Sequence, residues 1–369
     1  MSEIKPLAFY LPQYHPIPEN NEWWEEGFTE WTNVTKAKPL YNGHEQPILP
    51  ADLGFYDLRV EETREHQAKL AKEYGLYGFI YYHYWFGDDK MVLERIAEEV
   101  LSSGKPDFPF CFCWANETWS GIWHGLQNQI LVEQKYLGKE DIKKHFEYLL
   151  PFFQDDRYIK VEGKPVLFIY EPLKIPNSQE YLSQYRQYAK DVGFPDLFII
   201  SSSKGVDELD YVALGYDANV SNSYHQAFDR ERAEFLKFSL LDRAIGRLFP
   251  DYLMNKGPVL IDNVIVNSNI VFRDTNVETY PMVVPNWDNT ARSNKRGVVM
   301  QNSSPKLFEK EVQKAVRFLS NKSEEHHKFL IIKSWNEWAE GNILEPDRKF
   351  GHGYLQALRN CLEEENKNR

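Results

Sequence analysis

Eight short apolar runs, each ending in polar and aromatic residues, constrain the fold of this chain more than any other feature of its sequence. Segments of helical length with charged faces lie between several of them, at 94–101, 139–153, 179–189 and 307–319. Strands that alternate with helices favour a parallel sheet, and eight such units close a (β/α)8 TIM barrel, an α/β fold with long βα loops. The predicted strands are Leu7–Leu11, Gly78–Tyr82, Phe108–Cys113, Pro165–Ile169, Leu197–Ile200, Ala218–Val220, Met282–Val284 and Phe329–Ile332.

The chain reads as one domain over residues 1–369. It contains no low-complexity stretch, charge block or Pro/Gly/Ser-rich linker, and no repeat with a period of 20 to 50 residues. Residues 226–279 fit none of the strand and helix units. We interpret them as a loop insertion on the face of the barrel that carries the active site.

Composition excludes several classes of partner. The 55 acidic and 43 basic residues give a net charge of -12, which disfavours binding to nucleic acid and to anionic membranes. No apolar run approaches the roughly 18 to 20 residues of a membrane span, and the first residues lack a signal-peptide core. The three cysteines suit a reducing compartment, so we expect a cytoplasmic protein without direct membrane insertion. Oligomeric state is left open.

The chemistry that the sequence supports requires no cofactor. Cys111 and Cys113 alternate within a predicted strand and read as packing residues, because no further Cys or His pair completes a metal site. The chain has no Gly-x-Gly-x-x-Gly, no phosphate-binding loop and no Gly-x-Ser-x-Gly nucleophile motif. It also has no Asp-x-Asp, the usual metal clamp for a nucleotide-sugar diphosphate.

The tryptophans cluster at the ends of predicted strands and in the loops that follow. Such an arrangement is typical of a cleft that stacks on sugar rings, although tryptophans also anchor long loops. The ten are Trp23, Trp24, Trp31, Trp85, Trp114, Trp119, Trp123, Trp287, Trp335 and Trp338, and none lies in a predicted helix.

Glu337 and Glu340 follow the last predicted strand, in the segment from Ser334 to Gly341. A helical turn there places both carboxylates on one side, and barrel enzymes carry their catalytic groups at this end of the strands. Glycosidases use two carboxyl groups, about 5 to 5.5 Å apart when the reaction retains configuration. The pair is therefore a candidate catalytic centre. The alternative is that the two glutamates only complement a helix dipole.

Other polar and aromatic residues at the strand ends are candidate substrate ligands. Glu117 and Asp288 could bind sugar hydroxyls or could be structural carboxylates, and Asn336 could orient its neighbours. The predicted binding residues are Tyr10, His15, His83, Tyr84, Trp85, Trp114, Asn116, Glu117, Tyr224, Trp287, Asp288, Trp335, Asn336 and Trp338.

Several spaced motifs give the chain a resemblance to the WbsX family, described as glycosyltransferases of bacterial polysaccharide gene clusters. They are the runs Phe9 to His15, Tyr82 to Trp85, Cys113 to Glu117, Asp156 to Lys160 with Gly163 to Pro165, Asn286 to Thr290 and Trp335 to Gly341. That family contains a domain similar to the endo-α-1,2-mannosidases of glycoside hydrolase family 99. The resemblance implies a retaining reaction through a 1,2-anhydrosugar, with Glu337 as base and Glu340 as acid and then base. Ala339 stands where those mannosidases more often have His, which puts the substrate in doubt.

Three functions therefore remain open. The first is a glycoside hydrolase or transglycosylase that acts on an α-linked bacterial surface polysaccharide or its precursor. The second is a nucleotide-sugar-dependent glycosyltransferase of O-antigen, lipopolysaccharide or capsule biosynthesis. The third is a non-catalytic glycan-binding protein. An oligosaccharide or polysaccharide is the expected partner in each case.

Overall fold

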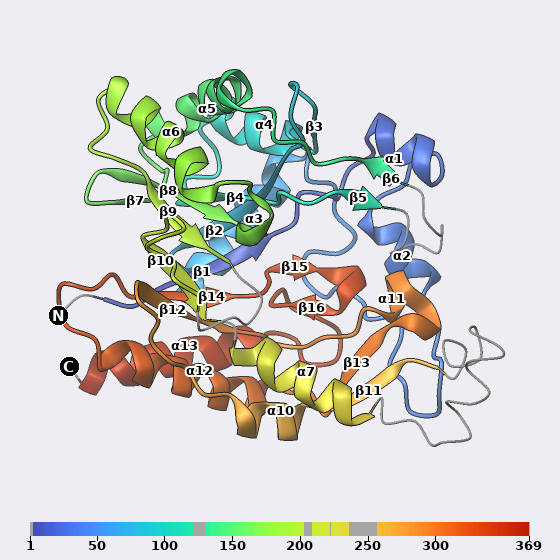
Figure 1. The fold of residues 1–369 in the computed structure, drawn as a ribbon. Coiled ribbons are helices and arrows are strands. Elements are labelled where there is room, and N and C mark those ends of the chain that lie inside the picture. Colours follow the sequence, from blue (N-terminus) through green and yellow to red (C-terminus); the bar gives the residue numbers. More distant parts are fainter. Residues whose placement is uncertain (1–2, 121–129, 203–208, 222, 236–256, 369) are drawn as a thin grey trace, which may run out of the picture.

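The computed structural model describes residues 3–368 except 121–129, 203–208, 222 and 236–256. Eight parallel strands form a closed barrel, because β1 pairs with both β2 and β14 and each remaining strand pairs with the next along the chain. The predicted (β/α)8 TIM barrel is therefore confirmed (Figure 1). Its strands are β1 (Lys5–Tyr10), β2 (Gly78–Trp85), β4 (Phe110–Trp114), β8 (Lys164–Ile169), β9 (Phe198–Ser201), β10 (Ala218–Ser221), β12 (Glu278–Val283) and β14 (Phe329–Ile332).

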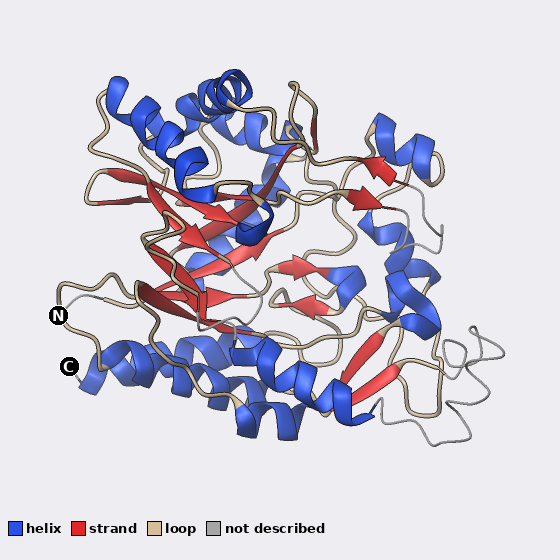
Figure 2. Ribbon diagram, viewed as in Figure 1, coloured by secondary structure: helices blue, strands red, loops and turns tan. Residues whose placement is uncertain are grey.

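Helices cover the outside of the barrel (Figure 2). The helix α12, for example, turns Phe308, Val312, Ala315 and Leu319 inward at helical spacing, and all four are buried. Among the described residues no helix lies between β9 and β10. The main covering helices are α3 (Glu61–Glu73), α4 (Arg95–Ser103), α5 (Lys139–Gln154), α6 (Ser178–Asp191), α12 (Pro305–Ser320) and α13 (Gly353–Asn368).

Side chains alternate between the lumen of the barrel and the layer beneath the helices. Phe9 of β1 points into the lumen, where its ring stacks on Tyr82 at 5.3 Å and meets Phe168 edge-on at 6.1 Å. Cys113 lies opposite Tyr82 and Phe168 in the register, so it faces the lumen as well. The interior is thus a packed core, and a substrate can only approach its ends.

Short elements extend the barrel beyond the carboxyl ends of its strands, on the side opposite the two termini (Figure 1). The helices α2 and α11 pack against the short helix η4, which follows β15. These elements build the face on which barrel enzymes carry their active sites. They are α1 (Pro18–Trp23), α2 (Glu30–Lys36), β3 (Met91–Val92), β5 (Trp119–Ser120), β6 (Ile130–Val132), α11 (Thr290–Ser293), β15 (Asn336–Glu337), η4 (Trp338–Glu340) and β16 (Asn342–Ile343). Trp23 and Trp31 lie in α1 and α2, so the expectation that no tryptophan is helical is wrong.

The predicted insertion is more regular than a loop in its described parts. It contains the end of α7 (Ser223–Phe235), the strand β11 (Val259–Asp262) and the helix α10 (Asn263–Asn269). The strand β11 pairs in parallel with β13 (Val298–Gln301), outside the barrel. These elements share a small apolar core of their own beside α12. Residues 236–256 lie outside the described part of the chain.

Within the described residues, no helix combines the length and apolar character that a membrane crossing requires.

Replacing Glu311 by Gln is expected to stabilise the protein at alkaline pH. The buried Glu311 carboxyl accepts a hydrogen bond from Val284 N at 3.0 Å, and burial raises its pKa from 4.5 to about 8. Between these two values the unfolded chain ionises this carboxyl and the native protein does not, so wild-type stability falls as pH rises from about 4.5 to 8. The Gln side chain does not ionise, so the variant does not lose stability in this pH range for this reason. Urea unfolding at pH 5 and pH 9 should show a relative gain of about 4 kcal/mol at pH 9. An equal effect at both pH values would contradict the raised pKa.

Candidate active site

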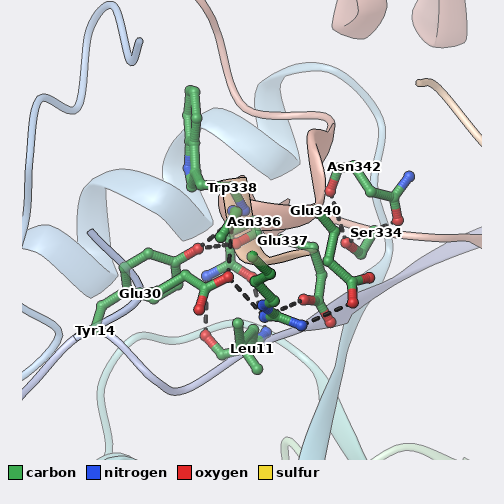
Figure 3. A network of polar contacts seen from close by, with 11 residues as sticks. Leu11, Tyr14, Glu30, Ser334, Asn336, Glu337, Trp338, Glu340 and Asn342 are labelled. Carbon is green, nitrogen blue, oxygen red and sulfur yellow. Dashed lines mark hydrogen bonds and ion pairs between the residues drawn. The ribbon is translucent and has the colours of Figure 1, made fainter. Parts of the chain in front are cut away.

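The chain makes a tight turn after β14 that presents Glu337 and Glu340. Asn336–Glu337 forms β15, a single helical turn follows, and β16 returns antiparallel to β15. Gly341 ends the turn with a φ of 52°, a left-handed conformation that side chains disfavour. A Cβ at Gly341 would also lie 2.9 Å from the backbone oxygen of Asp288. The turn directs both carboxylates to the same side, as Figure 3 shows.

A single guanidinium joins three carboxylates at this turn. Arg292 Nη1 donates to Glu340 Oε1 at 2.7 Å, and Arg292 Nη2 donates to Glu337 Oε2 at 3.2 Å and to Glu30 Oε1 at 2.6 Å. The Glu30 side chain is 1% exposed and those of Arg292 and Glu340 are 16% exposed. Arg292 comes from α11 and Glu30 from α2. Sequence reasoning missed both, because neither follows a barrel strand directly.

The surroundings of Glu337 favour its protonated form. Burial is the main cause, the neighbouring Glu340 and Glu30 add to it, and Arg292 opposes it, so that the pKa of Glu337 rises from 4.5 to about 8. Burial likewise raises the pKa of Glu30, again against the effect of Arg292. These surroundings favour the retention of a proton within this cluster of carboxyls in the ligand-free protein.

Polar contacts beneath the turn fix its position relative to β1. The Asn336 side chain accepts from Leu11 N at 2.7 Å and donates to Leu11 O at 3.0 Å. The Tyr14 hydroxyl donates to the Asn336 carbonyl and accepts from Trp338 N. Trp338 Nε1 donates to Glu345 Oε2 at 2.6 Å. Asn336 and Trp338 are buried and fully engaged, so they position the turn, and our expectation that they bind substrate directly is corrected.

The mouth of the barrel, which is the opening at the carboxyl ends of its strands, is lined by further aromatic and charged side chains. Burial raises the pKa of the Tyr84 hydroxyl, and the nearby Glu337 raises it further, which indicates that Tyr84 lies near the carboxylate pair. Trp287 is partly exposed, and the Glu117 side chain is 33% exposed and lies 3.8 Å from Lys174. Of the predicted binding residues, Tyr84, Trp287 and Glu117 are thus placed at the mouth. Sequence reasoning missed Tyr170 and Lys333, which line the same opening.

Four predicted binding residues point away from the mouth, under the helices. The hydroxyl of Tyr10 donates to Gln67 at 2.8 Å, and the imidazole of His83 contacts His145 at 2.8 Å. Trp85 stacks on His145, and Trp114 Nε1 donates to the Trp85 carbonyl at 2.9 Å. These side chains occupy the outward positions of their strands and are buried. They pack the barrel against α3, α5 and α6, so the expectation that they contact a sugar is corrected. The corrected residues are Tyr10, His83, Trp85 and Trp114.

Two further predicted ligands are structural. Asn116 holds the loop after β8 by donating to the Glu171 carbonyl at 2.9 Å and accepting from Glu171 N at 2.8 Å. The Asp288 carboxylate lies 2.8 Å from His44 Nε2 and accepts from Thr290 N at 3.0 Å. Both side chains are buried with their polar atoms engaged. Of the two readings of Asp288, the structural one is favoured.

Three more predicted ligands are buried. Tyr224 belongs to the small apolar core beside α12 and contacts the Met300 sulfur, and Trp335 is fully buried against Phe79. His15 is 1% exposed, and burial lowers its pKa to about 4. Because these side chains are buried, the expectation that they bind substrate is corrected.

Among the tryptophans only some remain available for a sugar. Trp23, Trp24, Trp119 and Trp287 are partly exposed, and Trp123 lies outside the described residues. The other five are buried.

A cavity of about 490 Å³ lies next to the site, and Trp287 and Asp288 form part of its wall. Gly341 also lines it, whereas Glu337 and Glu340 do not. Its wall includes Tyr41, His44, Gln301, Arg348, Phe350 and Tyr354, a mixture of aromatic and polar side chains that suits sugars.

A closed (β/α)8 barrel with a carboxylate pair at the carboxyl end of its last strand places the chain among proteins with the fold of glycoside hydrolases. Two solved structures have this fold: a glycoside hydrolase-like protein (TM-score 0.60, 14% identity, 98% of this chain and 94% of that one) and an endo-α-mannosidase of glycoside hydrolase family 99 from Bacteroides thetaiotaomicron (TM-score 0.57, 13% identity, 100% and 98%). At such identities the likeness concerns the fold alone.

The family described as glycosyltransferase WbsX matches residues 6–358, and the chain therefore belongs to this family. It is also 34% identical, over 96% of its length, to an uncharacterized protein WxcX of Xanthomonas campestris pv. campestris. A second strain of that organism has a relative at 33% identity. The chain spans about half the length of these curated relatives, 49% in each case.

Proposed function

We propose that this chain cleaves or transfers at an α-glycosidic bond, similar to an α-mannoside bond, of a bacterial surface polysaccharide or its precursor, with retention of configuration. The observation that carries the proposal is the pair Glu337 and Glu340 at the mouth of the barrel, bridged by Arg292. Retaining glycosidases need two closely spaced carboxyl groups, one of which gives up a proton while the other takes one. Partly exposed aromatic rings beside the pair offer stacking surfaces for sugars.

In the proposed first step, Glu337 takes the proton of the sugar 2-hydroxyl, and the resulting oxygen attacks the anomeric carbon. The bond to the leaving group breaks, and Glu340 gives its proton to the departing oxygen. In the second step Glu340 takes a proton from water or from an acceptor hydroxyl, which opens the 1,2-anhydrosugar at the anomeric carbon. Glu337 then returns its proton to the 2-oxygen. Two inversions restore the original configuration, and the acceptor decides between hydrolysis and transfer.

The raised pKa of Glu337 supports its role as the base. A carboxylate whose pKa is about 8 is a stronger base than an ordinary one, and removing a proton from a sugar hydroxyl demands this. Because Glu340 must hold a proton at the same time, activity should be highest where the pair carries one proton.

The second candidate function is a glycosyltransferase that uses a nucleotide sugar. The description of the family as glycosyltransferase WbsX favours it. Such an enzyme would need a nucleotide sugar as donor. A retaining centre of the glycosidase type would act on an existing glycosidic bond without a nucleotide sugar.

The test compares α-linked bacterial oligosaccharides incubated with and without a mixture of nucleotide sugars, with products followed by mass spectrometry. We expect shortened or rearranged glycans without nucleotide, and isotope-labelled water or an acceptor glycan separates hydrolysis from transfer. Extension that strictly requires nucleotide sugar would refute the proposal in favour of the transferase.

A further inference from the structure

Lys333 is a buried cation at the mouth of the barrel. It follows β14 directly, and its backbone N donates to the Val283 carbonyl at 3.0 Å, which continues the ladder between β12 and β14. Ile331 faces the lumen, so the alternation of the strand turns Lys333 the same way. The residue is 8% exposed, although lysine is rarely buried without a partner.

The contacts of the Lys333 ammonium are aromatic. Its Nζ lies 5.6 Å from the centre of the Tyr170 ring and 5.8 Å from that of Trp287. Within the described part of the chain, no ion pair and no hydrogen bond involves this Nζ atom. The other cations of the mouth are paired: Arg292 with three carboxylates, and Lys174 with Glu117 and Glu171 at 3.8 Å each.

Among the described residues, no carboxylate lies at ion-pair distance from this buried ammonium. Contact with aromatic rings compensates only part of the loss of water around a lysine, because the ring quadrupole attracts a cation less than a carboxylate does. Lys333 is close enough to Glu337 to oppose the rise of its pKa, which places the ammonium beside the catalytic pair. An anion that enters the mouth would thus meet a cation that is already desolvated and held in place.

We propose that Lys333 binds an anionic group, a carboxylate or a phosphate, on the glycan that occupies the mouth beside Glu337 and Glu340. This inference rests on the proposed function, since it names the class of glycan that the same site takes: an acidic one. Tyr170 and Trp287 hold the ammonium and flank the sugar that carries the anion. Glu117 and Glu171 do not compete for Lys333 because they lie at ion-pair distance from Lys174.

The test measures binding alone, so it is independent of turnover. Lysine side chains are labelled by ¹³C-dimethylation, and the wild-type protein and the variants Lys333→Met, Lys333→Arg and Lys174→Met are titrated by NMR. The probes are mannose, mannuronate and mannose 6-phosphate, with α-linked disaccharides of the same sugars. Lys174→Met is the matched control, because it removes a more exposed lysine from the same mouth of the barrel. Thermal unfolding of each variant verifies that it is folded.

We expect the acidic sugars to bind about 100-fold more tightly than mannose, a factor that corresponds to one charge-assisted contact. Lys333→Met should remove this preference, Lys333→Arg should retain part of it, and Lys174→Met should retain nearly all. The better of mannuronate and mannose 6-phosphate identifies the anion as carboxylate or phosphate. Equal affinity for neutral and acidic sugars would overturn the inference, and so would a failure of every acidic sugar to bind at millimolar concentration. A neutral glycan that is cleaved while acidic ones do not bind would refute this inference and leave the proposed function intact.

Discussion

Replacement of Glu337 or Glu340 by Gln is expected to lower kcat/KM by about 10³-fold or more, because each variant loses a group that moves a proton in the reaction. Gln preserves the size of the side chain and much of its hydrogen bonding, so the variants should still bind the glycan. Product formation and calorimetric affinity are measured on the same preparations. Full retention of turnover by either variant would rule out the proposed pair.

The matched control for these variants is Glu311→Gln, which makes the same chemical change at a buried carboxyl of α12 that contacts Val284 after β12. It should leave turnover intact. If wild type and all variants bind glycan equally and none turns it over, the chain is a glycan-binding protein without catalytic activity.

The pH dependence of wild type tests whether the pair needs a proton. The proposed first step needs Glu337 ionised and Glu340 protonated, so the active form carries one proton on the pair. We therefore expect kcat/KM to pass through a maximum and to fall as pH rises beyond about 8, where the pair has lost this proton. A rate that keeps rising above pH 8 would contradict a proton-donating carboxyl in the pair.

Replacement of Arg292 by Met is expected to destabilise the native protein by about 3 kcal/mol or more near pH 9, since it leaves buried carboxylates without their shared cation. Arg292 lowers the pKa of Glu337 and Glu30, so its loss should raise both further. Wild type already keeps each carboxyl protonated up to its own raised native pKa, which is about 8 for Glu337, so the added cost of the variant accumulates as pH rises through and beyond that value. At lower pH the native carboxyls are protonated in both proteins, and the difference from wild type should shrink.

Urea unfolding of wild type and Arg292→Met at pH 6 and pH 9 measures this effect. The double variant Glu30→Gln with Arg292→Met is the control, because it removes one carboxylate together with the cation and should recover part of the stability at pH 9. A loss of stability that is the same at both pH values would show that Arg292 contributes by packing rather than by charge.

The sequence predicted the barrel because the signals for it are local. All eight apolar runs became barrel strands, and the helix-length segments between them became helices with ends displaced by a few residues. Strands that are buried on both faces read as continuous apolar runs, and they need no long-range information to be recognised. The positions of Glu337 and Glu340 on one side of a turn are local in the same sense, since they are only three positions apart in the sequence.

The tertiary structure decided which side chains reach the mouth. In β2 the run from Tyr82 to Trp85 alternates between the lumen and the outer layer, and its two faces are equally aromatic in sequence. The register with the neighbouring strands puts Tyr82 and Tyr84 inside and turns the other two residues under the helices. A shift of one residue would exchange the two sets, so the pattern alone could not tell ligand from packing residue.

The sequence by itself thus determined the fold and the position of the carboxylate pair, because both depend on contacts between residues near each other in the chain. Only the tertiary structure brought Arg292 and Glu30 to the turn that carries this pair, across sequence separations of 45 residues to Glu337 and 309 residues to Ala339. It also left Lys333 buried beside them with aromatic neighbours. The charge state of such a site depends on burial and on the sum of all neighbouring charges, and both exist only after the barrel has closed.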